Sequence, residues 1–175
     1  MPSLYDISVP PMKRTVRSAL HILKLGEEWA AEQETPRSEI PGWRLHENML
    51  PLSAQVILVT VQAKLLVANL TGGERPTVTL PELSLDGLYT LLDETIALLD
   101  SVDSAEKVTA DESTVLSLRA GPRQVRIALL DSVLSYTIPH SYFHLVTLYD
   151  ILRMKGVPLG KSEYMLSHFK EVAID

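Results

Sequence analysis

The sequence contains no cysteine among its 175 residues. This absence excludes disulfide bonds, cysteine-based zinc sites and thiol nucleophiles together, and it is compatible with a reducing intracellular compartment. Apolar residues make up 46% of the chain and charged residues 22%, which is ordinary for a globular protein. A chain of this size and composition can build a core without crosslinks, so residues 1–175 are expected to form one domain.

The sequence also lacks any concentration of positive charge. The net charge is −6, and the densest basic group consists of Lys13, Arg14 and Arg17. Nucleic-acid binding usually requires a basic face, so no nucleic-acid partner is expected. The N-terminal residues have no basic-then-apolar signal pattern, and the most apolar stretch, residues 56–67, is too short to span a membrane. We therefore expect a cytoplasmic protein with no membrane partner.

Motifs that would name a reaction directly are missing as well. The chain has no Gly-x-Ser-x-Gly elbow, no phosphate-binding loop and no dinucleotide fingerprint. Any candidate chemistry must therefore come from individual polar side chains within otherwise apolar segments.

Apolar periodicity predicts four helices, at about residues 12–34, 51–70, 84–101 and 130–155. Residues 1–10 are expected to be extended, because the Pro10-Pro11 pair disfavours helix before it and can start one after it. The predicted caps are Ser84 at the start of the third helix, and the glycines at 72–73 and 156 at the ends of the second and fourth.

Residues 114–129 have a different pattern. Apolar and polar residues alternate on both sides of Ala120-Gly121-Pro122, which predicts a β-hairpin. A hairpin of this size is not stable alone, so we expect it to pack against the helices. The sequence thus predicts an all-α fold, a helical bundle with a small β-hairpin insertion before the last helix.

The second predicted helix contains three amides among its apolar residues. Gln55, Gln62 and Asn69 are seven residues apart and therefore lie nearly on one line along the helix. A buried amide costs free energy unless it is hydrogen-bonded, so each needs a partner or a wet cavity. Two interpretations remain open: the amides cap loops and neighbouring helices, or Gln62 lines an internal pocket.

The last predicted helix carries the best candidate site. His140 and His144 are four residues apart, so both project from one face on successive turns. Such a pair can form an acid–base site, or it can share a metal ion, which most often needs at least a third ligand. Pro139 removes a helical hydrogen bond to the carbonyl of Ser135, and a kink there would favour a cavity.

Aromatic residues surround this pair in the sequence. They give an apolar pocket its walls and its hydroxyl donors: Tyr136, Tyr142, Phe143 and Tyr149. We expect Tyr136 to assist the two histidines in catalysis. The expected substrate-binding residues are Gln62, Gln55, Trp43, Tyr142 and Tyr149. The loop that contains His46 could fold over the bundle, whereas His21 and His168 are expected to be solvated or to make packing contacts.

Three stretches together resemble a domain-of-unknown-function branch of the DinB/YfiT-like four-helix-bundle superfamily. The first is Ser3-Leu4-Tyr5-Asp6 followed by Ser8-Val9-Pro10, and the second is Met49-Leu50-Pro51-Leu52 with Gln55. The third is Tyr142-Phe143-His144 running to Gly156-Val157-Pro158-Leu159-Gly160-Lys161. The resemblance covers the whole chain, and it implies an up-down-down-up bundle and a homodimer as a possible assembly.

The resemblance also implies a divalent metal held by three histidines. Two of them form a His-xxx-His on the last helix, and the second lies twelve residues before a helix-ending glycine, as His140, His144 and Gly156 do here. The third ligand is expected in the second helix, where this chain has Gln62. An amide oxygen is a poorer ligand for zinc or nickel than imidazole. We therefore expect either no cofactor or a weakly held divalent metal (Zn or Ni) bound by His140, His144 and Gln62.

Two classes of function follow. In the first, the chain is an enzyme acting on a small-molecule ligand by proton transfer in an apolar pocket, with His144 as base, His140 as partner acid and Gln62 orienting the substrate. An isomerisation, dehydration or cyclisation needs no cofactor and suits these residues, while the resemblance adds a thiol-transferase-like activity. In the second, the chain is a non-catalytic ligand-binding or stress-related protein with a degenerate metal site.

Overall fold

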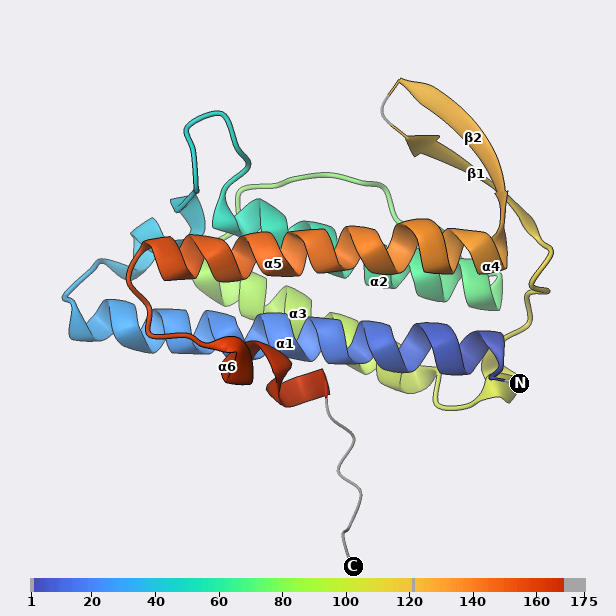
Figure 1. Cartoon of the computed structure of the whole chain (residues 1–175), viewed down its shortest axis with the longest axis horizontal. Coiled ribbons are helices and arrows are strands. Elements are labelled where there is room, and N and C mark those ends of the chain that lie inside the picture. The colour runs from blue at the N-terminus through green and yellow to red at the C-terminus, as the bar shows by residue number, and fades with distance from the viewer. Residues whose placement is uncertain (1, 121, 169–175) are drawn as a thin grey trace, which may run out of the picture.

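A computed structural model describes residues 2–120 and 122–168, and it is mostly helical. The four longest helices are α1 (Leu4–Glu32), α2 (Leu52–Thr71), α3 (Leu85–Ser101) and α5 (Ile138–Met154). Helices α1 and α5 run in one direction, and α2 and α3 run in the opposite direction (Figure 1). Helix α2 packs against α3 and α5, and α1 packs against the same two. A mostly helical fold with a small antiparallel hairpin before the last helices was predicted and is confirmed.

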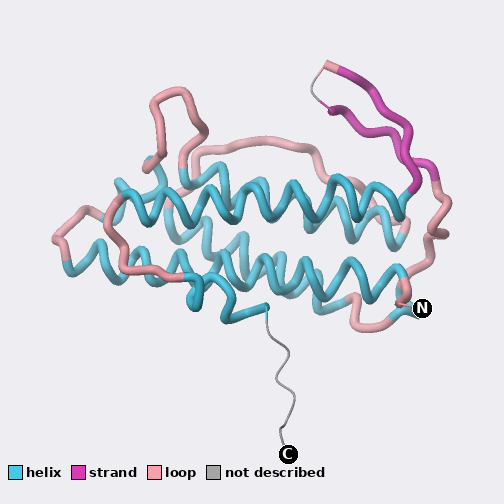
Figure 2. Tube along the Cα trace, in the orientation of Figure 1, coloured by secondary structure: helices cyan, strands magenta, loops and turns pink. Residues whose placement is uncertain are grey.

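Shorter elements join and cover these helices (Figure 2). They are η1 (Arg37–Gly42), η2 (Ala105–Lys107), β1 (Val115–Ala120), β2 (Arg123–Ala128), α4 (Leu129–Ser132), η3 (Val133–Thr137), α6 (Lys161–Met165) and η4 (Leu166–His168). Helix α6 lies against α1, where the Ser18 hydroxyl donates a hydrogen bond to the carbonyl of Tyr164. The side chain of His168, expected to be solvated or packed, lies outside the described part of the chain.

The first helix begins earlier than the sequence predicts. The extended segment expected at residues 1–10 is wrong, because α1 starts at Leu4 and contains Pro10 and Pro11. Ser3 and Asp6 form a capping box, in which the Ser3 hydroxyl accepts from the Asp6 N–H and the Asp6 carboxylate accepts from the Ser3 N–H. The prolines cost two helical hydrogen bonds, but the early turns bury Leu4, Val9 and Met12, and that packing outweighs the local cost.

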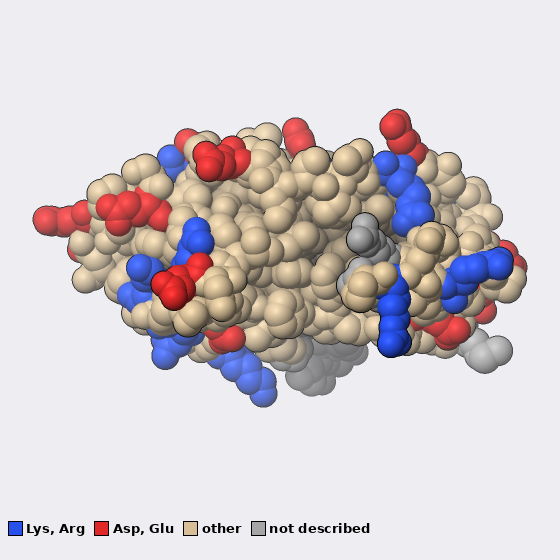
Figure 3. All heavy atoms as spheres, turned by 90° about the horizontal axis from the view of Figure 1, so that it is seen from above, with Lys and Arg blue, Asp and Glu red and all other residues tan. Residues whose placement is uncertain are grey.

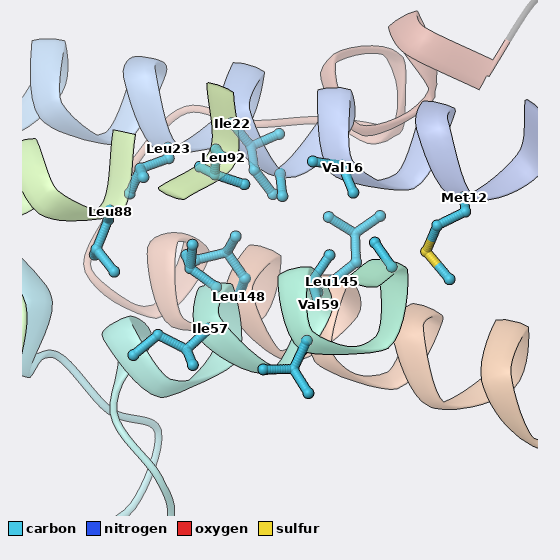
Figure 4. Packing of buried hydrophobic residues seen from close by; sticks show 14 of the residues in the cluster. Met12, Val16, Ile22, Leu23, Ile57, Val59, Leu88, Leu92, Leu145 and Leu148 are labelled. Carbon is cyan, nitrogen blue, oxygen red and sulfur yellow. The ribbon is translucent and has the colours of Figure 1, made fainter. Parts of the chain in front are cut away.

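Helix α2 lies at the centre of the core. By length and composition it could cross a membrane, but most of it is buried against the other helices, which is typical of a core helix. Figure 4 shows Ile57 and Val59 of α2 among the packed apolar side chains, with Leu145 and Leu148 of α5 and Val16 and Ile22 of α1. These contacts place the inward faces of α2 and α5 against each other, where the candidate site lies.

The predicted hairpin is present, but it packs less than expected. Strands β1 and β2 pair antiparallel from Val115 opposite Ala128 to Ala120 opposite Arg123. The hairpin projects away from the helices in Figure 1. Of its described side chains, Leu116 belongs to the core, and Leu118 and Ile127 pack against it. Val115 and Val125 remain exposed. The expectation that the hairpin packs against the helices therefore holds only for these three side chains.

The last predicted helix is interrupted by a wider turn. Elements α4, η3 and α5 follow one another without a gap from Leu129 to Met154, and η3 is a π-helix. The π-turn lies directly before Pro139, whose ring and missing N–H disturb the α-helical pattern. The predicted caps are confirmed: Ser84 accepts from the Gly87 N–H at 3.2 Å, and Gly72 and Gly156 have φ values of 69° and 98°.

Charged side chains are unevenly distributed over one face. Seen from above in Figure 3, the face bearing α5 and the hairpin has a broad uncharged middle, with Lys, Arg, Asp and Glu mainly toward its two ends. The exposed apolar residues Phe143 and Val146 belong to α5. Helix α5 therefore exposes some apolar side chains as well as burying others in the core.

Candidate functional site

The site lies where the π-turn joins the last long helix. His140 and His144 project from successive turns of α5, with their ring centroids 4.6 Å apart and their planes at 72°. His144 is buried, and its Nε2 lies 3.1 Å from Nε2 of His140. The four-residue spacing thus brings the two imidazoles into direct hydrogen-bonding contact, as expected for one helix face.

Gln55 of α2 is the second partner of His144. Its Oε1 lies 2.7 Å from His144 Nδ1, and the amide is 3% exposed. At its other end, the Gln55 Nε2 donates to the Leu50 carbonyl at 3.1 Å. Because the Leu50 carbonyl can only accept, this bond fixes which end of the amide carries oxygen. Gln55 therefore presents an acceptor to His144.

This orientation fixes both histidine tautomers. Since Gln55 Oε1 accepts, His144 Nδ1 must carry the proton, and the neutral ring has its lone pair on Nε2. That lone pair accepts from His140, so His140 carries its proton on Nε2 and its lone pair on Nδ1. The hydrogen bonds form one directed relay from His140 through His144 and Gln55 to Leu50, and the unused lone pair lies at the His140 end.

His140 Nδ1 has no hydrogen-bond partner among residues 2–120 and 122–168. Among the side chains that the structure describes, it is the one buried nitrogen or oxygen without a hydrogen bond. The Tyr136 ring stacks on the His140 ring, with centroids 5.2 Å apart and an angle of 27°, and thus holds its orientation. Leaving a buried acceptor unsatisfied costs about 1–3 kcal/mol. An unpaired acceptor held in a fixed place is a feature that a bound ligand can use.

Burial keeps both rings neutral. Burial, and to a lesser extent the neighbouring His140, lowers the pKa of His144 from 6.5 to about 4. Burial likewise lowers the pKa of His140. Both imidazoles are therefore uncharged at neutral pH, the state in which a histidine has a free lone pair and can act as a base.

The two imidazoles alone are an incomplete set of protein ligands for a divalent metal. No group of three or more His, Asp or Glu residues gathers within residues 2–120 and 122–168. The Gln55 oxygen is already used by His144 Nδ1, so it orients that ring and is not a third ligand. If His140 bound a metal through Nε2, its proton would move to Nδ1, where no acceptor holds it. The weakly held zinc or nickel with Gln62 as a ligand stays a prediction.

Gln62 is buried but does not join the relay. No described hydrogen bond links it to either histidine, whereas Gln55, two turns earlier on α2, bonds to His144. Because α2 and α5 run in opposite directions, Gln62 lies about 10 Å further along, near the level of Thr137 in the π-turn. The structure therefore gives Gln55 the position at His144 that the superfamily resemblance suggested for Gln62.

Three other predicted substrate-binding residues lie elsewhere. Trp43 packs edge-to-face on Trp29 at 6.4 Å, and the Lys155 ammonium lies 5.3 Å from the Trp43 ring, so Trp43 belongs to the far end of α5. Tyr149 contacts the Tyr164 ring at 6.0 Å. Burial, with a smaller contribution from Tyr142, raises the pKa of Tyr164, so Tyr142 lies in the neighbourhood of α6.

Two further contacts complete the surroundings of the pair. Phe143 packs edge-to-face on His144 at 5.3 Å while remaining exposed, so it covers the ring from outside. His46 does not reach the site, because its Nδ1 bonds to Asn48 Oδ1 at 2.8 Å in the bend before α2. Five cavities of 380–560 Å³ formed by the described residues are lined by other side chains. The expected apolar pocket around the histidines is not one of these five.

Comparisons with known proteins agree with this fold. The model of the family described as "Domain of unknown function (DUF1993)" matches residues 4–165. The crystal structure at 1.83 Å resolution of a DinB family member protein from Shewanella denitrificans is similar, with a TM-score of 0.81 and 25% sequence identity over 93% of this chain and 91% of that chain. A comparison with curated proteins found no match.

The family match extends over the helices that build the site. Residues 4–165 include α1, α2, α3 and α5, together with Gln55, His140 and His144. The high TM-score over nearly all of both chains agrees with the predicted resemblance to DinB-like proteins. The chain belongs to the DUF1993 family and has a DinB-like fold.

Proposed function

We propose that this protein is a small-molecule enzyme in which Gln55, His144 and His140 form a proton relay with His140 Nδ1 as the general base. The observation that carries the proposal is the buried, unpartnered Nδ1 at the end of an otherwise complete hydrogen-bond chain. Sequence reasoning assigned the base to His144. The tautomers favour the reverse, because both nitrogens of His144 are already engaged.

The relay supports His140 while it holds a proton. When Nδ1 takes a proton from a substrate, His140 becomes an imidazolium whose Nε2–H is already bonded to His144 Nε2. The charge is then stabilised by the lone pair of His144, whose own Nδ1–H is held by Gln55. Gln55 is thus a positioning residue, and Tyr136 keeps the His140 ring in place by stacking.

The chemistry that suits this arrangement is proton transfer without a redox cofactor. His140 accepts a proton from one substrate atom and returns it to another, which gives an isomerisation. Returning the proton to a leaving hydroxyl gives a dehydration, which releases water. In a cyclisation, the deprotonated atom attacks a carbonyl of the same molecule, and the proton returns to the carbonyl oxygen. The substrate class that fits the apolar surroundings is a small molecule with an acidic C–H whose proton Nδ1 can accept.

Isotope exchange tests this function before the substrate is known. Untagged protein is incubated with a polar metabolite extract in D₂O, and the compounds are followed by high-resolution mass spectrometry. A proton-transfer enzyme should introduce deuterium into at least one compound. His140→Gln should abolish the exchange, because the amide Nε2–H still donates to His144 but no base remains. Val146→Ala, at an exposed position of the same helix, should retain it.

Two results would contradict the enzyme hypothesis. No compound gains deuterium above a protein-free control, or His140→Gln exchanges as fast as the wild-type protein. The alternative, a non-catalytic ligand-binding protein, is favoured by one observation: none of the cavities of 380–560 Å³ is lined by the histidines. Under that alternative, the same extract should contain a compound that protects the protein thermally but exchanges no proton.

A further inference from the structure

A cavity lies on the opposite side of α2 from the histidines. The loop of residues 72–84 runs back along α2 to the start of α3, as Figure 1 shows, and its residues are nearly all exposed. Beneath it, the groove between α2 and α3 holds a cavity of about 480 Å³. A volume of this size falls within the usual range for small-molecule sites, about 300–1,000 Å³.

The walls of this groove are apolar, and α2 provides one of them. Ile57, Val61 and Lys64 recur at helical spacing and line the cavity from α2, while Leu91 lines it from α3. Pro76 and Pro81 of the loop lie across it. None of the residues lining this cavity belongs to the histidine relay, so the groove is a separate site.

Two opposite charges line the same apolar groove. Lys64 is half-buried on α2, and Glu94 is exposed on α3. Lys64 and Glu94 do not form an ion pair with each other. Among the described residues, the basic members of ion pairs are Lys13, Arg17 and Arg37. Lys64 also lines an adjoining cavity of about 440 Å³, so its side chain borders both cavities.

We propose that this groove binds a zwitterion with an apolar body, of the size and chemistry of a large apolar α-amino acid. The ligand carboxylate pairs with Lys64 and its ammonium pairs with Glu94, while its side chain occupies the space between Ile57, Val61 and Leu91. A ligand with a single charge satisfies only one of the two groups and is opposed by the other. Complementary charges therefore select the zwitterion, and the apolar walls select a large side chain.

Calorimetric titration of the full chain with three matched probes tests this proposal. The probes are L-phenylalanine, 3-phenylpropionate without the ammonium, and 2-phenylethylamine without the carboxylate. L-Phenylalanine should bind one to one. Each single-charge probe should bind about tenfold more weakly, because each loses one charged hydrogen bond.

Substitutions then separate the two charges. Lys64→Met should weaken L-phenylalanine and 3-phenylpropionate about tenfold but leave 2-phenylethylamine unweakened, and Glu94→Gln should do the converse. Lys24→Met removes the same charge from an exposed position of α1 and should change nothing. Thr90→Trp, which fills the groove from an exposed position of α3, should abolish binding of all three probes.

Each possible result decides the proposal. It is overturned if no probe gives a saturable heat up to about 10 mM, beyond the millimolar limit of weak specific binding. It is also overturned if 3-phenylpropionate or 2-phenylethylamine binds as tightly as L-phenylalanine, or if Lys64→Met and Lys24→Met behave alike. Circular dichroism of each variant confirms that a loss of binding is not a loss of fold.

Discussion

The buried histidine pair should make the protein sensitive to acid. His144 has a pKa of about 4 in the folded protein, compared with 6.5 for an unperturbed histidine. Because the folded-state pKa is lower, the unfolded chain binds a proton first as the pH falls. The contribution of neutral His144 to the free energy of unfolding is therefore fully present above the unfolded-state pKa. It is lost as the pH falls toward the folded-state pKa. Between about pH 7.5 and about pH 4.5 the loss is about 2.5 kcal/mol from His144 alone.

Substitution of His144 isolates this contribution from that of the carboxylates. In His144→Asn the side-chain amide can still donate to Gln55 Oε1, but it does not titrate in this range. Urea unfolding, followed by circular dichroism at a series of pH values, should show a shallower loss of stability in His144→Asn than in the wild-type protein. Between about pH 7.5 and about pH 4.5, the free energy of unfolding of the wild-type protein should fall by about 2.5 kcal/mol more than that of His144→Asn.

Thr147→Ala is the matched control on the same helix. Thr147 is buried one turn further along α5, and its hydroxyl donates to the Phe143 carbonyl at 2.8 Å. Its removal should lower stability by about 1 kcal/mol at every pH without changing the slope. The reasoning is refuted if His144→Asn has the same pH slope as the wild-type protein, because His144 would then not be neutral in the folded state.

Three further substitutions test other parts of the account by urea unfolding. Gln55→Ala should lower the free energy of unfolding by about 1–3 kcal/mol, because it leaves the His144 Nδ1–H buried without an acceptor. Gln124→Ala is the control at an exposed position, and an equal loss in the two variants would count against the relay. Ser3→Ala should cost about 1 kcal/mol by removing the cap of α1, whereas no loss would indicate that the helix starts after the prolines. Gly156→Ala should cost about 1–3 kcal/mol, because φ is 98° and a Cβ would lie 3.1 Å from the Trp29 ring. Gly42→Ala has no atom within 4 Å of its Cβ and should be close to neutral, so equal effects at the two glycines would be unexpected.

Most of the fold could be predicted because its signals are local. Apolar periodicity located the helices, and the glycines at 72 and 156 and Ser84 marked their ends. The start of α1 could not be predicted from the same rules. The prolines are a strong local signal against helix, and the burial of Leu4, Val9 and Met12 that overrides it depends on the assembled core.

The site was only partly predictable for a related reason. The spacing of His140 and His144 is a property of one helix, and the sequence identified it directly. Which residue of α2 contacts them depends on how far α2 and α5 are offset along their axes. A local sequence pattern does not indicate that offset. Gln55 and Gln62 lie on nearly the same line of α2, and only the packing places Gln55 at His144. The assignment of His140 as base then follows from hydrogen bonds that the sequence does not contain.

The tautomers of the two histidines provide the most direct test of the proposed relay. Long-range ¹H–¹⁵N NMR of the uniformly labelled protein at neutral pH distinguishes a protonated ring nitrogen from one with a lone pair. The relay predicts that His144 carries its proton on Nδ1, that His140 carries its proton on Nε2, and that both rings are neutral. A charged ring, or a His140 protonated on Nδ1, would contradict the assignment of His140 Nδ1 as the free base.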